Sequence, residues 1–142
     1  MINTNPNTSI VPAFGRVLMA AIFIFSGFGK LMAPTATIGY IASTGLPLAS
    51  LGYAIALVIE LGGGIALALG YQTRIVATVL ALFSLATGLA FHNAIGDQNQ
   101  MIHLMKNISM AGGFLQVAIF GAGAFSLDAK RLHHRTSAFK GA

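Results

Sequence analysis

One side chain is able to do chemistry in an otherwise apolar setting: Glu60, the single glutamate in a chain with three acidic residues. It lies near the middle of the apolar stretch 47–70, which is long enough to cross a bilayer. A carboxylate at that depth costs about 2.5–3.5 kcal/mol on insertion scales, so it usually faces protein and has a partner. Glu60 is therefore a candidate to bind a ligand or to relay a proton.

A second group of polar residues lies near the ends of the predicted helices. His103, Lys106 and Asn107 share one helix face because they are spaced by three and four residues. With Lys30 and His92 they predict a polar pocket that opens toward the outer side of the membrane. The candidate residues are, for catalysis, Glu60 and His92, and, for ligand binding, Arg16, Lys30, Glu60, His92, His103, Lys106 and Asn107.

Charged residues near helix ends also have a simpler explanation, because long cationic side chains often anchor a helix at the membrane surface. Lys30 and Arg74 fit that description. Arg16 lies within about one helical turn of a predicted helix end, from where it could reach toward Glu60 or out to the headgroups. Buried ionic groups can also serve only to fix helix register. These structural interpretations stay open beside the binding site.

Two histidines eleven residues apart, His92 and His103, raise the question of a metal or a haem. The chain has no cysteine and places few carboxylates near them, which disfavours a closed metal site. Histidine ligation of a haem stays a minor alternative. The sequence also has no nucleophile–base triad and no phosphate-binding glycine loop after a strand, so it gives no indication of a hydrolase or a nucleotide-binding protein.

The composition requires a membrane setting for these residues. The chain is 56% hydrophobic and 8% charged, and that charged share is about a third of the roughly 25% found in globular proteins. Segments of about 20 apolar residues can span a bilayer as helices, whose backbone groups pair internally. Four segments qualify: 13–32, 48–70, 74–92 and 105–123. We therefore predict a single-domain, all-α, polytopic membrane protein with a four-helix bundle.

The connections and the basic residues indicate an orientation. Segment 33–47 is bounded by prolines and predicts a short interfacial helix or a partly re-entrant loop. Six Lys and Arg residues fall on the side that holds both termini, and two fall on the other side, which predicts cytoplasmic termini. The basic tail 128–142 is interpreted as an orientation signal that contacts lipid, and not as a nucleic-acid site.

The glycine run at 62–64 directly follows Glu60. Each glycine weakens a helix by roughly 1 kcal/mol relative to alanine, so three in a row need a reason. Either another helix packs very closely there, or a ligand approaches the backbone.

Several motifs resemble those of the DoxX family of small four-helix bacterial inner-membrane proteins. The resemblance covers about residues 15–131 and follows the order of the predicted helices. It rests on Arg16 with FSGFGKL at 25–31, on Glu60, Gly64, Gly70 and Arg74, on His92 with KNISMAGG at 106–113, and on SLD at 126–128. It implies a multi-pass protein of the bacterial inner (plasma) membrane, and it implies site roles for Arg16, Lys30, Glu60, Arg74, His92, Lys106 and Asn107.

The resemblance also implies a redox setting. Some relatives are membrane subunits of quinone-reducing oxidoreductases that act on sulfur compounds, and others are linked to complexes with soluble redox partners. The absence of cysteine excludes a thiol–disulfide relay in this chain. No flavin, haem or iron–sulfur motif is present, so electrons would come from a partner protein or a soluble reductant.

Three functions stay open at this point, and with them the question of whether the chain is an enzyme. The first is a redox subunit that binds a quinone, with His92, Lys106 or Asn107 donating to the carbonyl and Glu60 relaying a proton. The second is a small-solute transporter, for which a homo-oligomer would supply the pathway. The third is a scaffold that anchors soluble partners to the bilayer.

Overall fold

A computed structural model describes residues 10–132, and these residues form helices without any strand. The long helices are α1 (Ile10–Met32), α5 (Thr73–Phe91) and α6 (Gln98–Phe120). A fourth rod is continuous but changes type along its length, through α3 (Ala49–Leu57), the π-helical η2 (Val58–Gly63) and α4 (Gly64–Leu69). The short α2 (Pro34–Ser43) follows α1, and residues 127–132 form a last helical segment.

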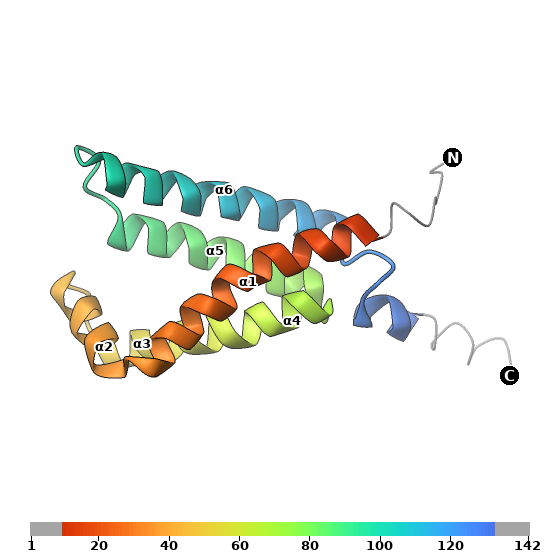
Figure 1. The fold of residues 1–142 in the computed structure, drawn as a ribbon, viewed down its shortest axis with the longest axis horizontal. Helices are drawn as coiled ribbons and strands as arrows, with labels where there is room; N and C mark the ends of the chain where they lie inside the picture. Colours follow the sequence, from red (N-terminus) through yellow and green to blue (C-terminus); the bar gives the residue numbers. More distant parts are fainter. Residues whose placement is uncertain (1–9, 133–142) are drawn as a thin grey trace, which may run out of the picture.

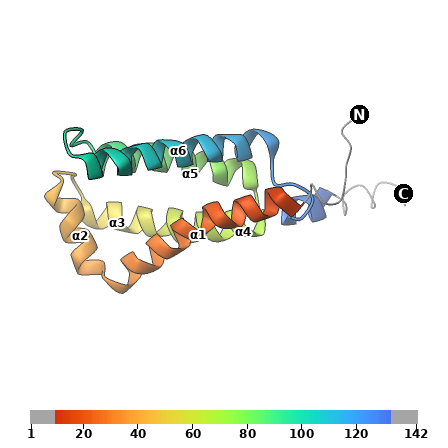
Figure 2. The same ribbon diagram turned by 45° about the horizontal axis from the view of Figure 1, so that its top comes forward.

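The rods pack as two pairs. Helices α5 and α6 run side by side and antiparallel, while α1 packs against the α3–η2–α4 rod (Figures 1 and 2). The core between the pairs is centred on Phe23 of α1, whose ring lies 5.3 Å from that of Phe114 and 6.4 Å from that of Phe83. Leu67 and Leu80 complete this core and are fully buried. The site described below lies at the end of the bundle that α2 covers.

Three of the rods are long and apolar enough to cross a membrane: Ile10–Met32, Ala49–Leu69 and Thr73–Phe91. Large apolar side chains on their outer faces are exposed in the isolated chain, as a lipid-facing surface requires. Helix α6 is as long as α1, at 23 residues, but its first half is polar and it is not among the three. The prediction of an all-α membrane protein is confirmed.

Two predicted boundaries are wrong at α6, which begins at Gln98 and not at residue 105. The reason is a cap: Asp97 Oδ1 accepts a hydrogen bond of 2.9 Å from the Gln100 backbone N–H, and this interaction starts the helix inside the polar loop. The helix ends at Phe120 and not at residue 123, because Gly121 adopts a φ of 86° that leaves the helical region.

Segment 33–47 contains a regular helix, α2, where the sequence left a helix and a re-entrant loop open. Pro34 is its first residue, a position at which the missing N–H has no intrahelical acceptor. Tyr40 of α2 stacks on Phe91 at the end of α5, with ring centroids 5.6 Å apart and planes at 22°. This contact holds α2 across the end of the bundle.

The glycine run at 62–64 is explained mainly by close packing. A side chain on Gly64 would place its Cβ 2.9 Å from Ile24 Cγ1 of α1, and one on Gly63 would lie 3.2 Å from Leu80 Cδ2 of α5. Nothing lies within 4 Å of the corresponding position on Gly62. The glycines therefore let the η2–α4 region contact both α1 and α5.

Arg16 stabilises the opposite end of the bundle from the predicted pocket. Its guanidinium is buried and donates hydrogen bonds to the carbonyls of Ala122 and Phe125, the latter at 2.9 Å. It neither turns toward Glu60 nor extends to the headgroups, because buried carbonyls in the loop after α6 need donors and Arg supplies them. A side chain on Gly70 would lie 2.7 Å from Arg16 Nη1, so glycine is needed there.

Asp128 secures the same region by binding the start of α5. Its carboxylate accepts hydrogen bonds of 2.8 Å from the backbone N–H groups of Gln72 and Thr73, and its own N–H donates to Gly70 O. Burial alone would raise the pKa of Asp128, but the hydrogen bonds from Thr73 and Gln72 and the charge of Arg131 outweigh it and hold that pKa below its ordinary value. Most of the predicted basic tail, from His133 onward, lies outside the described residues.

Candidate functional site

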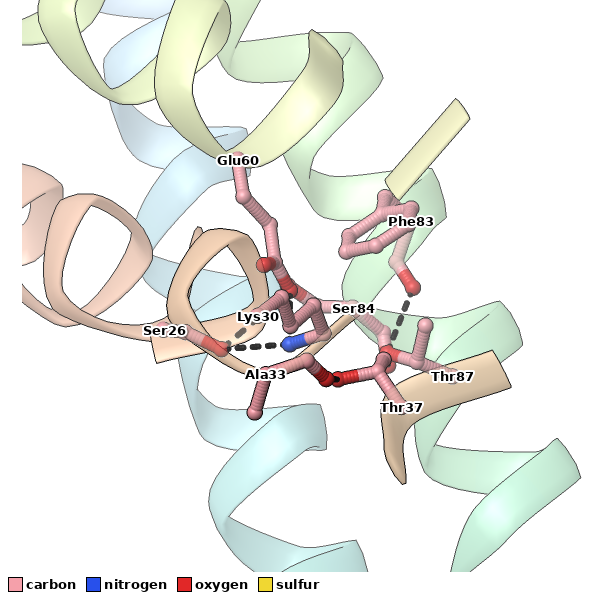
Figure 3. Close-up of polar contacts among 8 residues, drawn as sticks. All are labelled: Ser26, Lys30, Ala33, Thr37, Glu60, Phe83, Ser84 and Thr87. Atoms are coloured by element: carbon pink, nitrogen blue, oxygen red, sulfur yellow. Dashed lines mark hydrogen bonds and ion pairs between the residues drawn. The ribbon is translucent and has the colours of Figure 1, made fainter. Parts of the chain in front are cut away.

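A partly buried ion pair joins α1 to η2 at the centre of the candidate site. Lys30 Nζ lies 3.0 Å from Glu60 Oε1 and donates a second hydrogen bond of 2.7 Å to Ser26 Oγ (Figure 3). The Ser26 hydroxyl in turn donates to Glu60 Oε1 at 3.3 Å. The side chain of Glu60 is 7% exposed and that of Lys30 is 27% exposed. Glu60 thus has the cationic partner that its depth requires.

Local sequence explains how these groups meet. Ser26 and Lys30 are four residues apart, which places them one above the other on the same face of α1. Gly27 lies between them, and a Cβ there would be 2.8 Å from Leu61 Cγ and 3.1 Å from Glu60 Cβ. Glycine at this position therefore lets α1 approach η2 closely enough for the ion pair to form.

Glu60 itself lies in the π-helical segment η2. A π-helical turn accommodates one residue more than an α-helical turn, so it redirects the side chains that follow relative to a straight α-helix. Such turns are rare, and those that occur are frequently found at functional sites. The sequence analysis missed η2; the glycine run at 62–64 was its only signal.

The ion pair lies on the wall of a cavity of about 530 Å³. Six elements line the cavity, namely α1, α2, α3, η2, α5 and α6. Most of the lining is apolar, with the aromatic rings of Phe23, Tyr40, Phe83 and Phe91 among it. Both the volume and the mainly apolar lining are typical of sites for small organic ligands. The polar side chains in the lining are Ser26, Lys30, Thr37, Tyr40, Glu60, Thr87, His92, Lys106 and Asn107.

A second polar group lies at the junction of α5 and α6. The rings of His92 and His103 stack with centroids 4.9 Å apart, and His92 Nδ1 lies 2.8 Å from Gln100 Oε1. Lys106 Nζ is 3.1 Å from His103 Nδ1, which must accept because an ammonium only donates. Asn107 donates to His103 O at 3.0 Å and packs against Gly88, where a Cβ would be 2.9 Å from Asn107 Cβ.

The structure brings together five of the seven predicted ligand-binding residues at one cavity: Lys30, Glu60, His92, Lys106 and Asn107. His103 does not line the cavity but supports its rim through His92 and Lys106. Arg16 lies elsewhere, as described above. Arg74 is also away from this cavity, at the start of α5. Whether the five residues bind a ligand stays a prediction.

Sequence reasoning missed the roles of Ser26, Thr37, Tyr40 and Thr87 in this lining. The spacing of Ser26 from Lys30 could have revealed the first, but the others come from α2 and α5 and needed the fold. Within residues 10–132, no three His, Cys, Asp or Glu side chains come together as a group that could hold a metal ion.

Comparison with known proteins agrees with this architecture. The family model described as DoxX matches residues 11–93, which include Lys30, Glu60 and His92. The chain belongs to the DoxX family. Inner membrane protein YqjF of Escherichia coli K12 is 39% identical over 115 residues, which cover 80% of this chain and 85% of YqjF.

A second relative, inner membrane protein YphA of the same organism, is also 39% identical, over 120 residues that cover 80% of this chain and 84% of YphA. No solved structure matches the chain. With its apolar helices, this DoxX-family protein is a multi-pass protein of the inner membrane and lies in the lipid bilayer.

The ion pair predicts a specific pattern of stability. Lys30→Met leaves the Glu60 carboxylate without its cation, and breaking a buried pair from one side costs about 3–5 kcal/mol. Because Lys30 is partly exposed, we expect a loss in unfolding free energy near the lower end of that range. Lys30→Met/Glu60→Gln removes both charges and should regain most of the loss. Thermal unfolding in mild detergent, followed by circular dichroism, measures both effects.

A Lys30→Met variant as stable as the wild type would contradict this account of the pair. So would a double variant that is no more stable than the single one. Asp97→Asn is the matched control, because it also neutralises a carboxylate but keeps a good helix cap far from the pair.

Proposed function

We propose that this DoxX-family protein binds a small ring-bearing molecule of the quinone class in the cavity beside Lys30 and Glu60, as the membrane subunit of a redox system. The observation that carries the proposal is a partly buried ion pair on the wall of a cavity of about 530 Å³ with aromatic lining. Ionisable groups at membrane depth are expensive to keep and usually serve a ligand or proton pathway. A packing role alone would not require a cavity beside them.

The chemistry of the lining suits such a ligand. The rings of Phe23, Phe83 and Phe91 supply flat apolar walls, against which a ring can stack in offset or edge-to-face geometry. Lys30 supplies a charged donor at one polar point of the lining, and Lys106 and Asn107 supply donors at another. A quinone has a polar oxygen at each end of its ring, which two separate polar groups can bind.

A redox role assigns further tasks to the chain and to a partner. Reduction of a quinone takes two electrons and two protons, and Glu60 and His92 are the groups we propose for moving the protons. The electrons come from a soluble redox partner, because the sequence carries no motif for a flavin, a haem or an iron–sulfur cluster. The chain's part is then to hold the ring and to deliver protons to it.

We also propose that α6 is a fourth membrane span and that both termini are cytoplasmic. With 23 residues, α6 is about 35 Å long, enough to cross the hydrocarbon core, and it packs along α5 over its length. Six of the eight Lys and Arg residues lie near the start of α1, at the start of α5 or after α6, and Lys30 and Lys106 lie at the other end. In this orientation the cavity faces the outer leaflet.

The lack of cysteine makes this topology easy to test. Gly96→Cys, in the exposed α5–α6 loop, should react with a membrane-impermeant maleimide in intact spheroplasts. Lys130→Cys, also exposed, should react only after the membrane is permeabilised. The unmodified chain is the blank, since it has no thiol. Labelling of both positions in intact spheroplasts would contradict a fourth span.

Ligand binding is tested by mass spectrometry of small molecules extracted from protein purified in mild detergent. We expect a ring-bearing ligand in near-stoichiometric amount with the wild type and with Asp97→Asn. Glu60→Gln should reduce that amount by about 10- to 100-fold, because a hydrogen bond to a charged group contributes about 1.5–3 kcal/mol.

Only bulk phospholipid in all three samples would contradict the proposed binding. In that case the ion pair would serve helix packing, and a scaffold for partner proteins would be the better description.

A further inference from the structure

The Lys30–Glu60 pair has one hydrogen-bond donor and one acceptor left over. An ammonium has three N–H donors, and Lys30 directs two of them to Ser26 Oγ and Glu60 Oε1. Glu60 Oε1 accepts both from Lys30 and from Ser26, whereas Glu60 Oε2 is buried and has no hydrogen-bond partner among the described residues. A buried carboxylate oxygen without a donor is costly, so the pair is incomplete as it stands.

Other hydroxyls in the lining do not supply the missing donor. Thr87 Oγ1 donates to Phe83 O at 2.8 Å, and Thr37 Oγ1 donates to Ala33 O at 2.8 Å, so both hydrogens are used within their own helices (Figure 3). Ser26 already donates to Glu60 Oε1. No described residue, Tyr40 included, donates a hydrogen bond to Glu60 Oε2, which leaves a ligand in the cavity as a source of the donor.

We propose that the cavity recognises a hydroxyl group on an aromatic ring, whose oxygen accepts a hydrogen bond from Lys30 and whose hydrogen is donated to Glu60. A hydroxyl is the smallest group that satisfies both partners with one oxygen, while a carbonyl or an ether can only accept. The terminal torsion of Glu60 is soft, so its carboxylate can turn the free oxygen toward the cavity. This inference rests on the ligand binding proposed above.

The apolar part of the lining selects the ring. Phe23 and Phe83 lie in the same cavity as the ion pair, and Tyr40 and Phe91 stack on each other at another part of its wall. These faces favour a flat aromatic body over a flexible aliphatic alcohol. Applied to a quinone-class ligand, the inference means that the reduced, hydroxyl-bearing form binds more tightly than the oxidised, carbonyl-bearing form.

The test compares two probes, 4-hexylphenol and its methyl ether, 4-hexylanisole, in which a methyl group replaces the hydroxyl hydrogen. Equilibrium dialysis against the full chain in lipid nanodiscs, with empty nanodiscs as the blank, gives a dissociation constant for each probe. We expect the phenol to bind at least tenfold more tightly, because methylation removes the hydroxyl donor and leaves Glu60 Oε2 without a partner. Cyclohexanol with the same hexyl chain should bind more weakly than the phenol.

Variants then locate the effect. Glu60→Gln should bring the ratio of the dissociation constants of the ether and the phenol closer to one. Asp97→Asn should leave that ratio unchanged. Should Glu60→Gln fail to fold, the ratio in the wild type still decides the inference, since it needs no variant.

Equal binding of phenol and ether by the wild type would overturn the hydroxyl inference and leave the proposed ligand binding in place. Failure of every probe to bind above the empty nanodisc would overturn both.

Discussion

The Lys30–Glu60 ion pair sets the conditions that the surrounding structure has to meet. Two opposite charges inside an apolar bundle are stable only if they lie close together and have their remaining hydrogen-bonding groups satisfied. Gly27 provides the close approach between α1 and η2, and Ser26 supplies an additional hydrogen bond. The π-helical turn determines the direction of the Glu60 side chain relative to the rest of its rod. The ion pair depends on all of these features together, because they lie within a few ångströms of one another.

The two cationic side chains of α1 have different roles. Arg16 and Lys30 are fourteen residues apart, which places them about 21 Å from each other along the helix. Arg16 donates hydrogen bonds from its two terminal guanidinium nitrogens to carbonyl groups that follow α6, and Asp128 completes the same junction by binding the start of α5. Hydrogen bonds within the chain hold that end of the bundle together. At the Lys30 end, the free acceptor is an oxygen of a carboxylate, Glu60 Oε2, and a cavity with aromatic lining lies beside it, which is where a ligand can contribute.

Much of this arrangement could be predicted from the sequence, because length and apolarity identify membrane-spanning helices. The sequence also required a cation for Glu60 and offered Lys30 among the candidates. It could not show that Arg16 would bond to carbonyls more than a hundred residues away, since such contacts depend on how the last helix ends. The sequence also did not predict the early start of α6. The helix begins within the polar loop because the Asp97 side chain caps its first turn.

The site was harder to derive than the fold for a physical reason. Helix spacing reveals neighbours on one helix, such as Ser26 and Lys30, but not which faces of different helices meet. Thr87 and Tyr40 belong to the same lining only because α2 packs across the end of the bundle against α5. The π-helical turn also changes the helical register after Glu60, so an extrapolation along a regular α-helix misplaces the residues around it.

A donor from a bound ligand that completes the Glu60 carboxylate would change the vibrational bands of that carboxylate. Infrared difference spectroscopy on protein labelled with ¹³C-glutamate tests this directly, because Glu60 is the single glutamate and its carboxylate bands are then identifiable. On addition of a phenol, the account predicts a shift of the labelled carboxylate bands in the wild type and no such shift in Glu60→Gln. Bound phenol with unchanged Glu60 bands would contradict it.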